Sequence, residues 1–292
     1  MTARLLKLTP AVIGLTVVAA GTSVPELFVS VIAGLSGQAD LAVGNVVGSN
    51  IFNIAFVLGL CAIVRPLEIG GNTIRLEYPV LLIVTLMCLA VSQDGTINAV
   101  DGLLFVVFQI LFTMYLVTLV REQVSSAETG ELSGEVTELA TQPRLGPALL
   151  MVAIGVILLG FGASATVNGA VSLARLAGIS ERVIGLTIVA AGTSLPEVVA
   201  SLVSTLRGRA DIAIGNVIGS NLFNILGILG LSSLTHPLIV NPAISGNDVL
   251  WMLGLTVVLG PMLYSGRRVA RWEGVVLFLS YFVYTALLLR QG

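Results

Sequence analysis

The sequence has 292 residues, of which 56% are hydrophobic and only 10% are charged, and its mean hydropathy is +1.01. So few polar side chains cannot cover a water-soluble globule, and the soluble classes of protein are therefore excluded. The formal net charge of -2 excludes nucleic acid as a partner, because no excess of basic residues is present to neutralise phosphates. Cys61 and Cys88 lie inside apolar runs and predict neither a disulfide framework nor a zinc site.

Nine apolar stretches are long enough to cross a hydrocarbon core about 30 Å thick. In chain order they cover residues 11–33, 41–64, 77–92, 99–120, 146–170, 183–206, 212–235, 248–265 and 272–289. The third stretch is the shortest, and the first is too long for the apolar region of a cleavable signal peptide. The pattern predicts an all-α polytopic membrane protein.

One long polar segment, residues 121–145, separates the fourth and fifth stretches. It is rich in glutamate and has no apolar period, which is typical of a solvated linker. The sequence thus divides into a first membrane half at 1–120, an acidic linker at 121–145 and a second membrane half at 146–292.

The basic residues are distributed unevenly between the two sides of the predicted spans. Eleven of the 14 Lys and Arg residues fall on one side if the spans alternate, and only Arg175, Arg182 and Arg290 fall on the other. The eleven are Arg4, Lys7, Arg65, Arg75, Arg121, Arg144, Arg207, Arg209, Arg267, Arg268 and Arg271. The positive-inside rule makes that side, with the linker, cytoplasmic and leaves the C-terminus outside.

The two halves are copies of one unit. Residues 13–26, IGLTVVAAGTSVPE, match 184–197, IGLTIVAAGTSLPE, and residues 44–53, GNVVGSNIFN, match 215–224, GNVIGSNLFN. Equivalent spans are five positions apart in the order of spans, an odd number, so the copies cross the membrane in opposite directions. The arginine distribution agrees independently. Two inverted-topology repeats are typical of secondary transporters.

The repeats are not equal in length. Their alignment runs back to TARL at 2–5 and LARL at 173–176, yet the second repeat has a further span upstream, at 146–170, and the first has none. A symmetric protein would have five helices in each repeat. The nine visible spans therefore predict a tenth helix before Met1.

An acid stands in the middle of an apolar span in each repeat, at Glu26 and Glu197. A carboxylate at that depth costs about 2.5–3.5 kcal/mol on insertion scales, and no Lys or Arg lies at matching depth to offset it. A bound cation is the partner that this pattern indicates. The alternative is a protonated carboxyl group with a structural role.

Oxygen-bearing side chains accompany each acid at helical spacing, so they share its face of the helix. They are Thr22 and Ser30 around Glu26, Thr193 and Ser201 around Glu197, and in the next spans Asn45, Ser49 and Asn53 with Asn216, Ser220 and Asn224. Hydrogen bonding between packed helices is the alternative for any single one of them. A set repeated at one spacing beside an acid favours a cation site.

Local breaks are expected beside the acids. Pro25 and Pro196 each remove a backbone N–H and weaken the helix, which is the expected construction of a midplane site with free carbonyl groups. Asp40 and Asp211 are expected to be helix N-caps near the interface. Carboxylate, amide, hydroxyl and carbonyl oxygens without His or Cys suit hard cations such as Ca²⁺ or Na⁺.

The two motif pairs, GTSVPE with GNVVGSNIFN and GTSLPE with GNVIGSNLFN, resemble the α-repeats of the cation/calcium exchanger superfamily, in its sodium/calcium exchanger branch. The resemblance implies ten helices, alternating access and exchange of Ca²⁺ for Na⁺ in a prokaryotic inner or plasma membrane, by a chain that functions as a monomer without a resident cofactor. The ligands it implies are the side chains of Thr22, Ser23, Glu26, Ser49, Asn53, Thr193, Ser194, Glu197, Ser220 and Asn224 and the carbonyl groups of Ala19 and Ala190.

The sequence departs from the family at two points. Some relatives have Asp where this chain has Asn53 or Asn224, which lowers the negative charge of the site and leaves the ion stoichiometry open. No large regulatory domain interrupts the linker. An antiporter of Ca²⁺, or of another cation, against H⁺ remains the main alternative, and a cation channel is a lesser one. No catalytic motif is present, so an enzyme is not expected.

Overall fold

The computed structural model describes residues 14–128, 150, 154–155, 157–158, 161, 169, 171–172 and 174–291. In this part of the chain the structure is helical apart from four two-residue strands and short connections. Six helices are long and apolar enough to cross a membrane, and one bent helix pair is a seventh candidate. The predicted all-α, multi-span architecture is confirmed. Most of the predicted linker and of the predicted span 146–170 lies outside the described residues.

The acid-bearing span of each repeat is broken close to its acid. In the first repeat it consists of η1 (Gly14–Val18, a π-helix), α3 (Ala19–Thr22) and α4 (Val24–Leu35). Its copy consists of α10 (Glu181–Ile184), η4 (Gly185–Val189, also a π-helix), α11 (Ala190–Thr193) and α12 (Leu195–Leu206).

A non-helical serine makes each break, Ser23 with ψ 9° and Ser194 with ψ 7°. The next helix starts with a proline among its first residues, since proline has no N–H to continue the previous one. In the second repeat the two parts meet at 44°. The break that the sequence predicts at Pro25 and Pro196 is therefore present.

The next span of each repeat forms the centre of the molecule. It runs through α5 (Ala39–Phe52), η2 (Asn53–Leu58, a π-helix) and α6 (Gly59–Val64), and its copy through α13 (Ala210–Leu222), η5 (Phe223–Leu229, a π-helix) and α14 (Gly230–Thr235). The most apolar windows of these two spans are 83% and 89% buried, whereas the outer spans reach at most 50%. Polar groups on the central spans are thus removed from lipid and water.

Glycines let the central helices approach the broken ones. A Cβ atom on Gly48 of α5 would lie 2.6 Å from the carbonyl oxygen of Leu186, and one on Gly219 of α13 would lie 2.3 Å from that of Leu15. Helices that cross at backbone contact leave no room for a side chain between them, as in other small-residue crossings in membranes. Each central helix therefore packs directly against the broken span of the other repeat.

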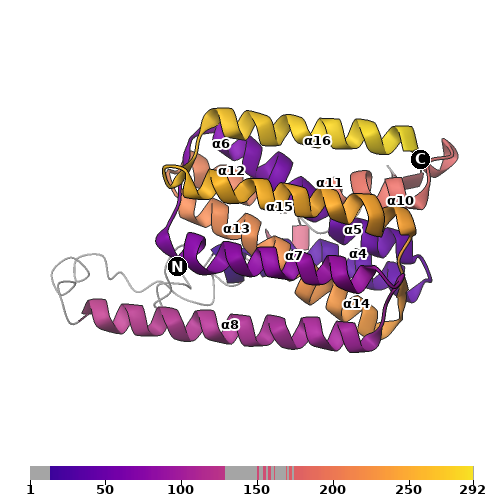
Figure 1. The fold of residues 1–292 in the computed structure, drawn as a ribbon, viewed down its shortest axis with the longest axis horizontal. Coiled ribbons are helices and arrows are strands. Elements are labelled where there is room, and N and C mark those ends of the chain that lie inside the picture. The colour runs from indigo at the N-terminus through magenta and orange to yellow at the C-terminus, as the bar shows by residue number, and fades with distance from the viewer. Residues whose placement is uncertain are drawn as a thin grey trace.

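Four outer helices surround this centre (Figure 1). They are α7 (Tyr78–Ser92) with η3 (Thr73–Glu77, a π-helix) before it, α8 (Ala99–Glu128), α15 (Val249–Tyr264) with η6 (Ile244–Asp248, a π-helix) before it, and α16 (Arg271–Gln291). Because η3 and α7 together begin at Thr73, the third span is four residues longer at its start than the expected 77–92.

Two short antiparallel strand pairs close the two ends of the bundle. Strand β1 (Leu67–Glu68) pairs with β4 (Arg268–Val269), and β2 (Thr96–Ile97) pairs with β3 (Leu238–Ile239). The helix α7 runs from β1 to β2, so the two pairs lie at opposite ends. Since β3 is the repeat-two copy of β1, equivalent elements lie at opposite ends, as inverted repeats require.

The last helix of each repeat covers the other repeat. Helix α16 crosses α6 where Gly59 meets Gly274, and α8 crosses α14 where Gly102 meets Gly230. At the first crossing a Cβ on Gly274 would lie 2.8 Å from the carbonyl oxygen of Gly59. The two repeats are thus interleaved, and neither half forms a separate bundle.

Asp40 and Asp211 are not N-caps, contrary to the prediction. The capping positions of α5 and α13 are Gln38 and Arg209, and neither makes a side-chain cap hydrogen bond. Each aspartate is the second residue of its helix, where a carboxylate still interacts favourably with the helix dipole. Asp40 also accepts a hydrogen bond from Asn241 Nδ2 at 3.2 Å.

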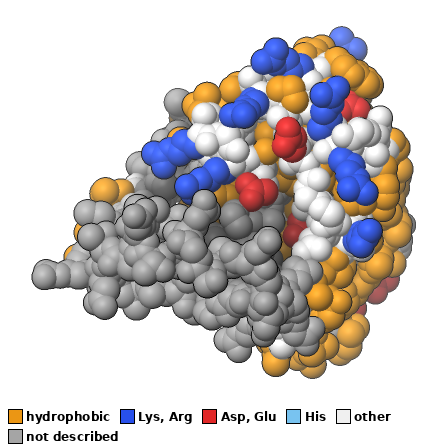
Figure 2. Space-filling model, turned by 90° about the vertical axis from the view of Figure 1, so that its left-hand side faces the viewer, with side chains coloured by type: hydrophobic (Ala, Val, Ile, Leu, Met, Phe, Trp, Pro, Cys, Tyr) orange, Lys and Arg blue, Asp and Glu red, His pale blue; other side chains and the backbone are white. Residues whose placement is uncertain are grey.

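Exposed arginines gather at the end of the bundle that carries β1 and β4 (Figure 2). The exposed arginines at this end, in the connecting segments and in the helix ends next to them, are Arg65, Arg75, Arg207, Arg209, Arg267, Arg268 and Arg271. At the opposite end the described residues include Arg175 and Arg290, which are exposed, and Arg182, which is buried. For the described residues the predicted separation of basic residues is present in three dimensions. Arg4, Lys7, Arg144 and the side chain of Arg121, which the prediction also included, lie outside the described part.

Candidate functional site

The two acids lie where the broken spans and the central helices meet. Glu26 and Glu197 are 0% exposed and stand in the first turns of α4 and α12. In each case the N-terminal end of the helix, with its partial positive charge, lies next to the carboxylate. The amino-acid order Ser-x-Pro-Glu produces this placement, because the serine breaks the helix and the proline restarts it.

Serine hydroxyls connect each acid to the opposite repeat. Ser23 Oγ donates to Glu197 Oε1 at 2.9 Å, and Ser194 Oγ donates to Glu26 Oε1 at 2.9 Å. Ser220 Oγ also donates to Glu197 Oε1, at 3.3 Å. These reciprocal bonds bring Ser23, Ser194 and both acids, which are far apart in sequence, to one place at the interface between the repeats.

Four buried oxygen atoms at this interface have no hydrogen-bond partner among the described residues. They are Glu26 Oε2, Glu197 Oε2, Asn53 Oδ1 and Asn224 Oδ1. All four residues are 0% exposed, and the atoms form two pairs related by the repeat. Buried acceptors without partners are rare in native structures and call for an explanation, which includes an ion as one possibility.

The charge of the site favours a cation. The buried arginine that the structure describes, Arg182, is paired with Asp248 through Nε and Oδ2 at 2.9 Å and belongs to a different cluster. The two glutamates therefore have no basic side chain beside them in the described part of the chain. Burying two carboxylates is costly unless opposite charge is supplied.

Other members of the predicted stripes are fully engaged with one another. Asn45 Nδ2 donates to Ser30 Oγ at 2.9 Å, and Thr193 Oγ1 lies 3.2 Å from Asn45 Oδ1. The copy of this cluster joins Asn216 to Ser201 at 2.9 Å and to Thr22 at 3.4 Å. For Asn45, Ser30 and their copies the alternative of hydrogen bonding between packed helices fits, because both the NH₂ group and the oxygen of each amide have hydrogen-bond partners.

The carbonyl groups of Ala19 and Ala190 are not freed by the prolines. They accept the backbone N–H groups of Ser23 and Ser194, both at 3.0 Å. Proline has no N–H, so Pro25 and Pro196 cannot make the helical hydrogen bond to the residue four positions earlier. The carbonyl groups that lose this bond are those of Gly21 and Gly192. Ala190 O remains directed toward the site, since Ser49 Oγ lies 3.5 Å from it, and a carbonyl oxygen has a second lone pair.

Asn50 and Asn221 also belong to the site, and the stripe pattern did not indicate them. Asn53 Nδ2 donates to Asn221 Oδ1, and Asn224 Nδ2 donates to Asn50 Oδ1, both at 3.1 Å. They fall outside the i, i+4 spacing of the stripes. The sequence signal that could have found them is the Ser-Asn pair that stands in both copies of the second motif.

The arrangement is suited to hard cations. It offers carboxylate, amide, hydroxyl and carbonyl oxygens, and it contains no His or Cys ligand. Among the described residues no cluster of three or more His, Cys, Asp or Glu is present. The two glutamates supply all the formal charge, and neutral oxygens supply the remaining coordination.

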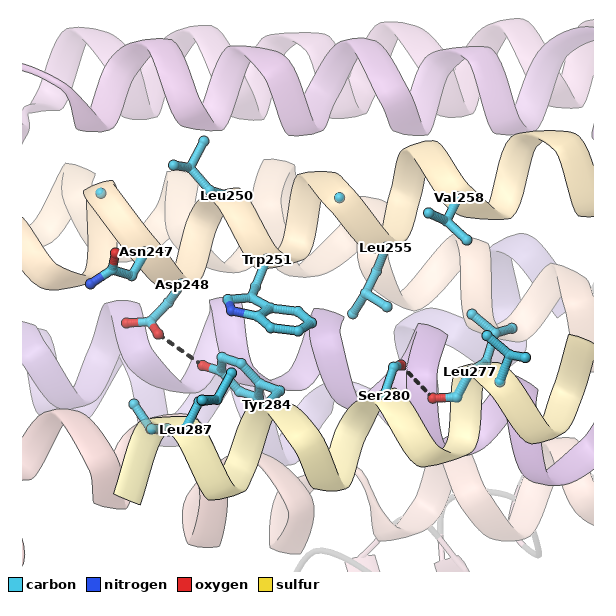
Figure 3. A pocket seen from close by; sticks show the side chains of 14 residues that line it. Asn247, Asp248, Leu250, Trp251, Leu255, Val258, Leu277, Ser280, Tyr284 and Leu287 are labelled. Atoms are coloured by element: carbon cyan, nitrogen blue, oxygen red, sulfur yellow. Dashed lines mark hydrogen bonds between the residues drawn. The ribbon is translucent and has the colours of Figure 1, made fainter. Parts of the chain in front are cut away.

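The site is distinct from the groove between α15 and α16 (Figure 3). That groove has a volume of about 560 Å³ and is lined mainly by apolar side chains such as Leu250, Trp251 and Leu255. At one end Tyr284 OH donates to Asp248 Oδ1 at 3.1 Å. None of the predicted ligand residues lines it.

Comparison with known proteins gives a consistent family. The family described as sodium/calcium exchanger protein matches residues 1–118 and 147–290. The chain is 36% identical over 280 residues to the inner membrane protein YrbG of Escherichia coli, covering 96% of this chain and 86% of that protein. It is 30% identical over 325 residues to the sodium/calcium exchanger MaX1 of Methanosarcina acetivorans, covering 95% and 88%.

Solved structures agree in fold. A structure of the sodium-calcium exchanger NCX_Mj soaked with 2.5 mM Na⁺ and 0.1 mM Ca²⁺ has a TM-score of 0.77 and 30% sequence identity, covering 98% of this chain and 89% of that chain. A second, soaked with 10 mM Na⁺ and 10 mM Sr²⁺, also has a TM-score of 0.77, at 31% identity.

Proposed function

The chain belongs to the sodium/calcium exchanger family, and from this premise we propose that it exchanges Ca²⁺ for Na⁺ by alternating access to the site between its repeats. Membership makes it a cation/calcium exchanger antiporter and not an enzyme. The identity of the two ions is the proposed part, together with the residues that bind them.

The observation that carries the proposal is the set of four buried oxygens without partners, on Glu26, Glu197, Asn53 and Asn224. An oxygen that can only accept needs either a proton donor or a cation. Because the four oxygens are related by the repeat, they face the interface from both halves. Ser23, Ser194 and Ser220 donate to the other oxygen, Oε1, of the same glutamates, and Ser49 Oγ lies 3.5 Å from Ala190 O. These hydroxyl groups can complete the coordination.

The same geometry explains why transport should be an exchange. With no cation bound, two fully buried carboxylates would face each other without opposite charge, and their cost opposes a closed, empty intermediate. A closed intermediate becomes accessible when a cation neutralises the pair. The site therefore returns across the membrane only with one ion or the other.

Na⁺ is favoured over protons as the coupling ion by the number of neutral oxygens. Two protons could neutralise Glu26 and Glu197, but they would leave Asn53 Oδ1 and Asn224 Oδ1 without partners. Several Na⁺ ions use both kinds of oxygen. If more than two Na⁺ replace one Ca²⁺, the exchange carries net charge.

Reconstituted vesicles provide the test. Protein in Na⁺-loaded proteoliposomes should take up ⁴⁵Ca²⁺ when diluted into Na⁺-free buffer at clamped pH and voltage, and an inside-positive potential should accelerate uptake if more than two Na⁺ leave. Uptake that needs a pH gradient and is indifferent to Na⁺ would replace this proposal with Ca²⁺/H⁺ antiport. Uptake without any counter-ion would indicate a channel.

The cellular arrangement is proposed on the same basis. From the exposed arginines at the β1–β4 end and the positive-inside rule we propose that this end is cytoplasmic, with residues 121–145 on the same side and the C-terminus outside. The membrane is the inner or plasma membrane of a prokaryote. One chain contains both halves of the site, so we propose that a monomer suffices.

A further inference from the structure

Both amides that face the site are held by an amide from the other repeat. Asn53 donates its NH₂ group to Asn221, and Asn224 donates its NH₂ group to Asn50, with both distances at 3.1 Å. All four side chains are at most 1% exposed. Bound in this way, Asn53 and Asn224 turn their NH₂ groups away and leave their Oδ1 atoms free.

The direction of these bonds is set by the backbone. Asn50 Nδ2 lies 3.4 Å from the carbonyl oxygen of Asn221, and Asn221 Nδ2 lies 3.3 Å from the carbonyl oxygen of Asn50. A carbonyl group can only accept, so it selects the NH₂ end of the amide beside it. The Oδ1 atoms of Asn50 and Asn221 therefore point away from these carbonyl groups. Each accepts a hydrogen bond from the NH₂ group of Asn224 or Asn53, respectively.

Helix geometry places the acceptors for this relay. Asn50 lies in the last turn of α5, directly before the π-helix η2, and Asn221 lies at the equivalent point of α13, before η5. π-helical turns inside α-helices occur often at functional sites. A backbone carbonyl already engaged in its helix retains a second lone pair for a side-chain donor.

From this relay we infer that Asn50 and Asn221 are positioning residues, which fix the amide oxygens of Asn224 and Asn53 toward the transported cation. Without the relay, an asparagine could rotate its amide and present NH₂ to the cation, which repels it. Each repeat thereby orients a ligand of the other. This inference rests on the proposed function, because it concerns ligands of the same site.

The consequence is specific to an amide ligand. A carboxylate has two equivalent oxygens and needs no partner to choose between them. If Asn50 acts by orienting Asn224, then replacing Asn224 by Asp should make Asn50 dispensable for binding. If Asn50 acts only by packing, its removal should cost the same whichever residue stands at 224. A double-mutant cycle separates the two roles.

The experiment measures Ca²⁺ and Na⁺ binding to purified protein by calorimetry, and the KM and maximal rate of ⁴⁵Ca²⁺ uptake in vesicles. Asn50→Ala should weaken Ca²⁺ binding about 10- to 100-fold, the range found when a residue that orients a metal ligand is lost. We expect the change mainly in KM. In the Asn224→Asp background the same substitution should change the Ca²⁺ affinity less than about threefold.

The control combines Asn50→Ala with a substitution of the asparagine that Asn50 does not orient. Asn50→Ala combined with Asn53→Asp should keep the full loss, because the side chain of Asn50 bonds the amide of Asn224 and not the amide of Asn53. The cycle of Asn221→Ala with Asn53→Asp should repeat the rescue in the other half, and it serves as a second test if an Asn50 variant fails to fold. Equal losses in the paired and mismatched backgrounds would overturn the inference.

The wild-type protein separates this inference from the proposed function. If the wild-type protein binds Na⁺ or Ca²⁺ but does not exchange them, the proposed exchange fails. The double-mutant cycle can then still be measured from the affinity for whichever ion the protein binds. If it binds neither ion, both proposals fail. If it exchanges the ions normally and the cycle shows no rescue, the relay alone is wrong.

Discussion

At the scale of single residues, polar side chains in the core differ by whether all their atoms have partners. Asn45 uses both ends of its amide, toward Ser30 and Thr193, whereas Asn53 uses only its NH₂ group. The i, i+4 spacing placed both asparagines on one stripe and could not separate them. Spacing indicates which face a side chain shares, but orientation of its amide depends on contacts from the other repeat.

Glu26→Gln and Glu197→Gln are expected to abolish Ca²⁺ exchange. Each change removes one of the two negative charges and can place an NH₂ group where an unpartnered oxygen now faces the cation site. Folding should survive, because glutamine has nearly the same shape and the Oε1 contact to serine can be kept. The measurements are Na⁺-dependent ⁴⁵Ca²⁺ uptake and size-exclusion profile in detergent.

Glu77→Gln is the matched control for these variants. Glu77 is 1% exposed, accepts a hydrogen bond from Thr73 Oγ1 at 2.7 Å, and lies outside the site. Its variant should retain exchange. Normal exchange by both site variants would refute the assignment of the acids as ligands, and loss in the Glu77 control alone would show that substitution of a buried acid is harmful for another reason.

At the scale of helices, the crossings through Gly48 and Gly219 should tolerate no side chain. Ala at either position would bring its Cβ within 2.6 Å or 2.3 Å of a backbone oxygen of the other repeat. Relieving that contact requires the helices to separate, and overpacking of this kind costs about 1–3 kcal/mol. We expect Gly48→Ala and Gly219→Ala to lower thermal stability in detergent and to slow exchange.

Gly254→Ala provides the comparison for the crossing glycines. Gly254 lies in α15, and a Cβ built on it meets nothing within 4 Å. The same chemical change there should leave stability and exchange at wild-type values. If all three alanine variants have the same stability and exchange rate, the close approach of the central helices is not the reason why Gly48 and Gly219 must be glycine.

Among the described residues, a buried ion pair joins two helices of the second repeat. Arg182 of α10 pairs with Asp248 of η6 at 2.9 Å, and Tyr284 of α16 donates to the same carboxylate at 3.1 Å. The position equivalent to Asp248 in the first repeat is Glu77, whose carboxylate accepts a hydrogen bond from Thr73. The described parts of the two repeats are therefore held differently at opposite ends of the bundle.

Arg182→Leu should lower the free energy of unfolding by about 3–5 kcal/mol, because it leaves Asp248 buried without its cation. The double variant Arg182→Leu with Asp248→Leu should recover much of that loss, since it removes both charges together. Thermal unfolding in detergent measures both. A double variant as unstable as the sum of the single variants would show that the pair does not act through charge compensation.

Some boundaries of these helices could be predicted and others could not. The breaks at Ser23 and Ser194 follow from proline chemistry and were expected. The start of the third span at Thr73 was missed because Arg75 and Glu77 reduce the apolar signal there, although Glu77 is 1% exposed. A charged residue that folding buries looks like a helix end in the sequence alone.

At the scale of the whole molecule, duplication made the architecture predictable, while the interleaving was not. Two copies of one unit in opposite directions imply a two-fold arrangement with the shared motifs at its centre. Helices α8 and α16 each cover the other repeat because of two glycine crossings, Gly102 with Gly230 and Gly274 with Gly59. An outer helix has apolar side chains both toward lipid and toward its neighbours, so its sequence does not show which helix it packs against.

The distribution of arginines predicts the orientation of the molecule in the membrane. Exposed arginines gather at the β1–β4 end, so that end should be cytoplasmic and the β2–β3 end should face outside. Cys61 and Cys88 are each 1% exposed and should give little background with a thiol reagent that cannot cross membranes. Single cysteines can therefore be introduced at each end.

Arg268→Cys marks the β1–β4 end, and His236→Cys, two residues before β3, marks the other; both native side chains are exposed. In intact cells a membrane-impermeant maleimide should label the His236→Cys variant and should reach the Arg268→Cys variant only after permeabilisation. The reverse pattern would invert the proposed orientation, and equal labelling of both variants in intact cells would contradict a single orientation. Because inverted repeats present equivalent elements to both sides, the arginines supply the asymmetry that fixes which way the molecule inserts.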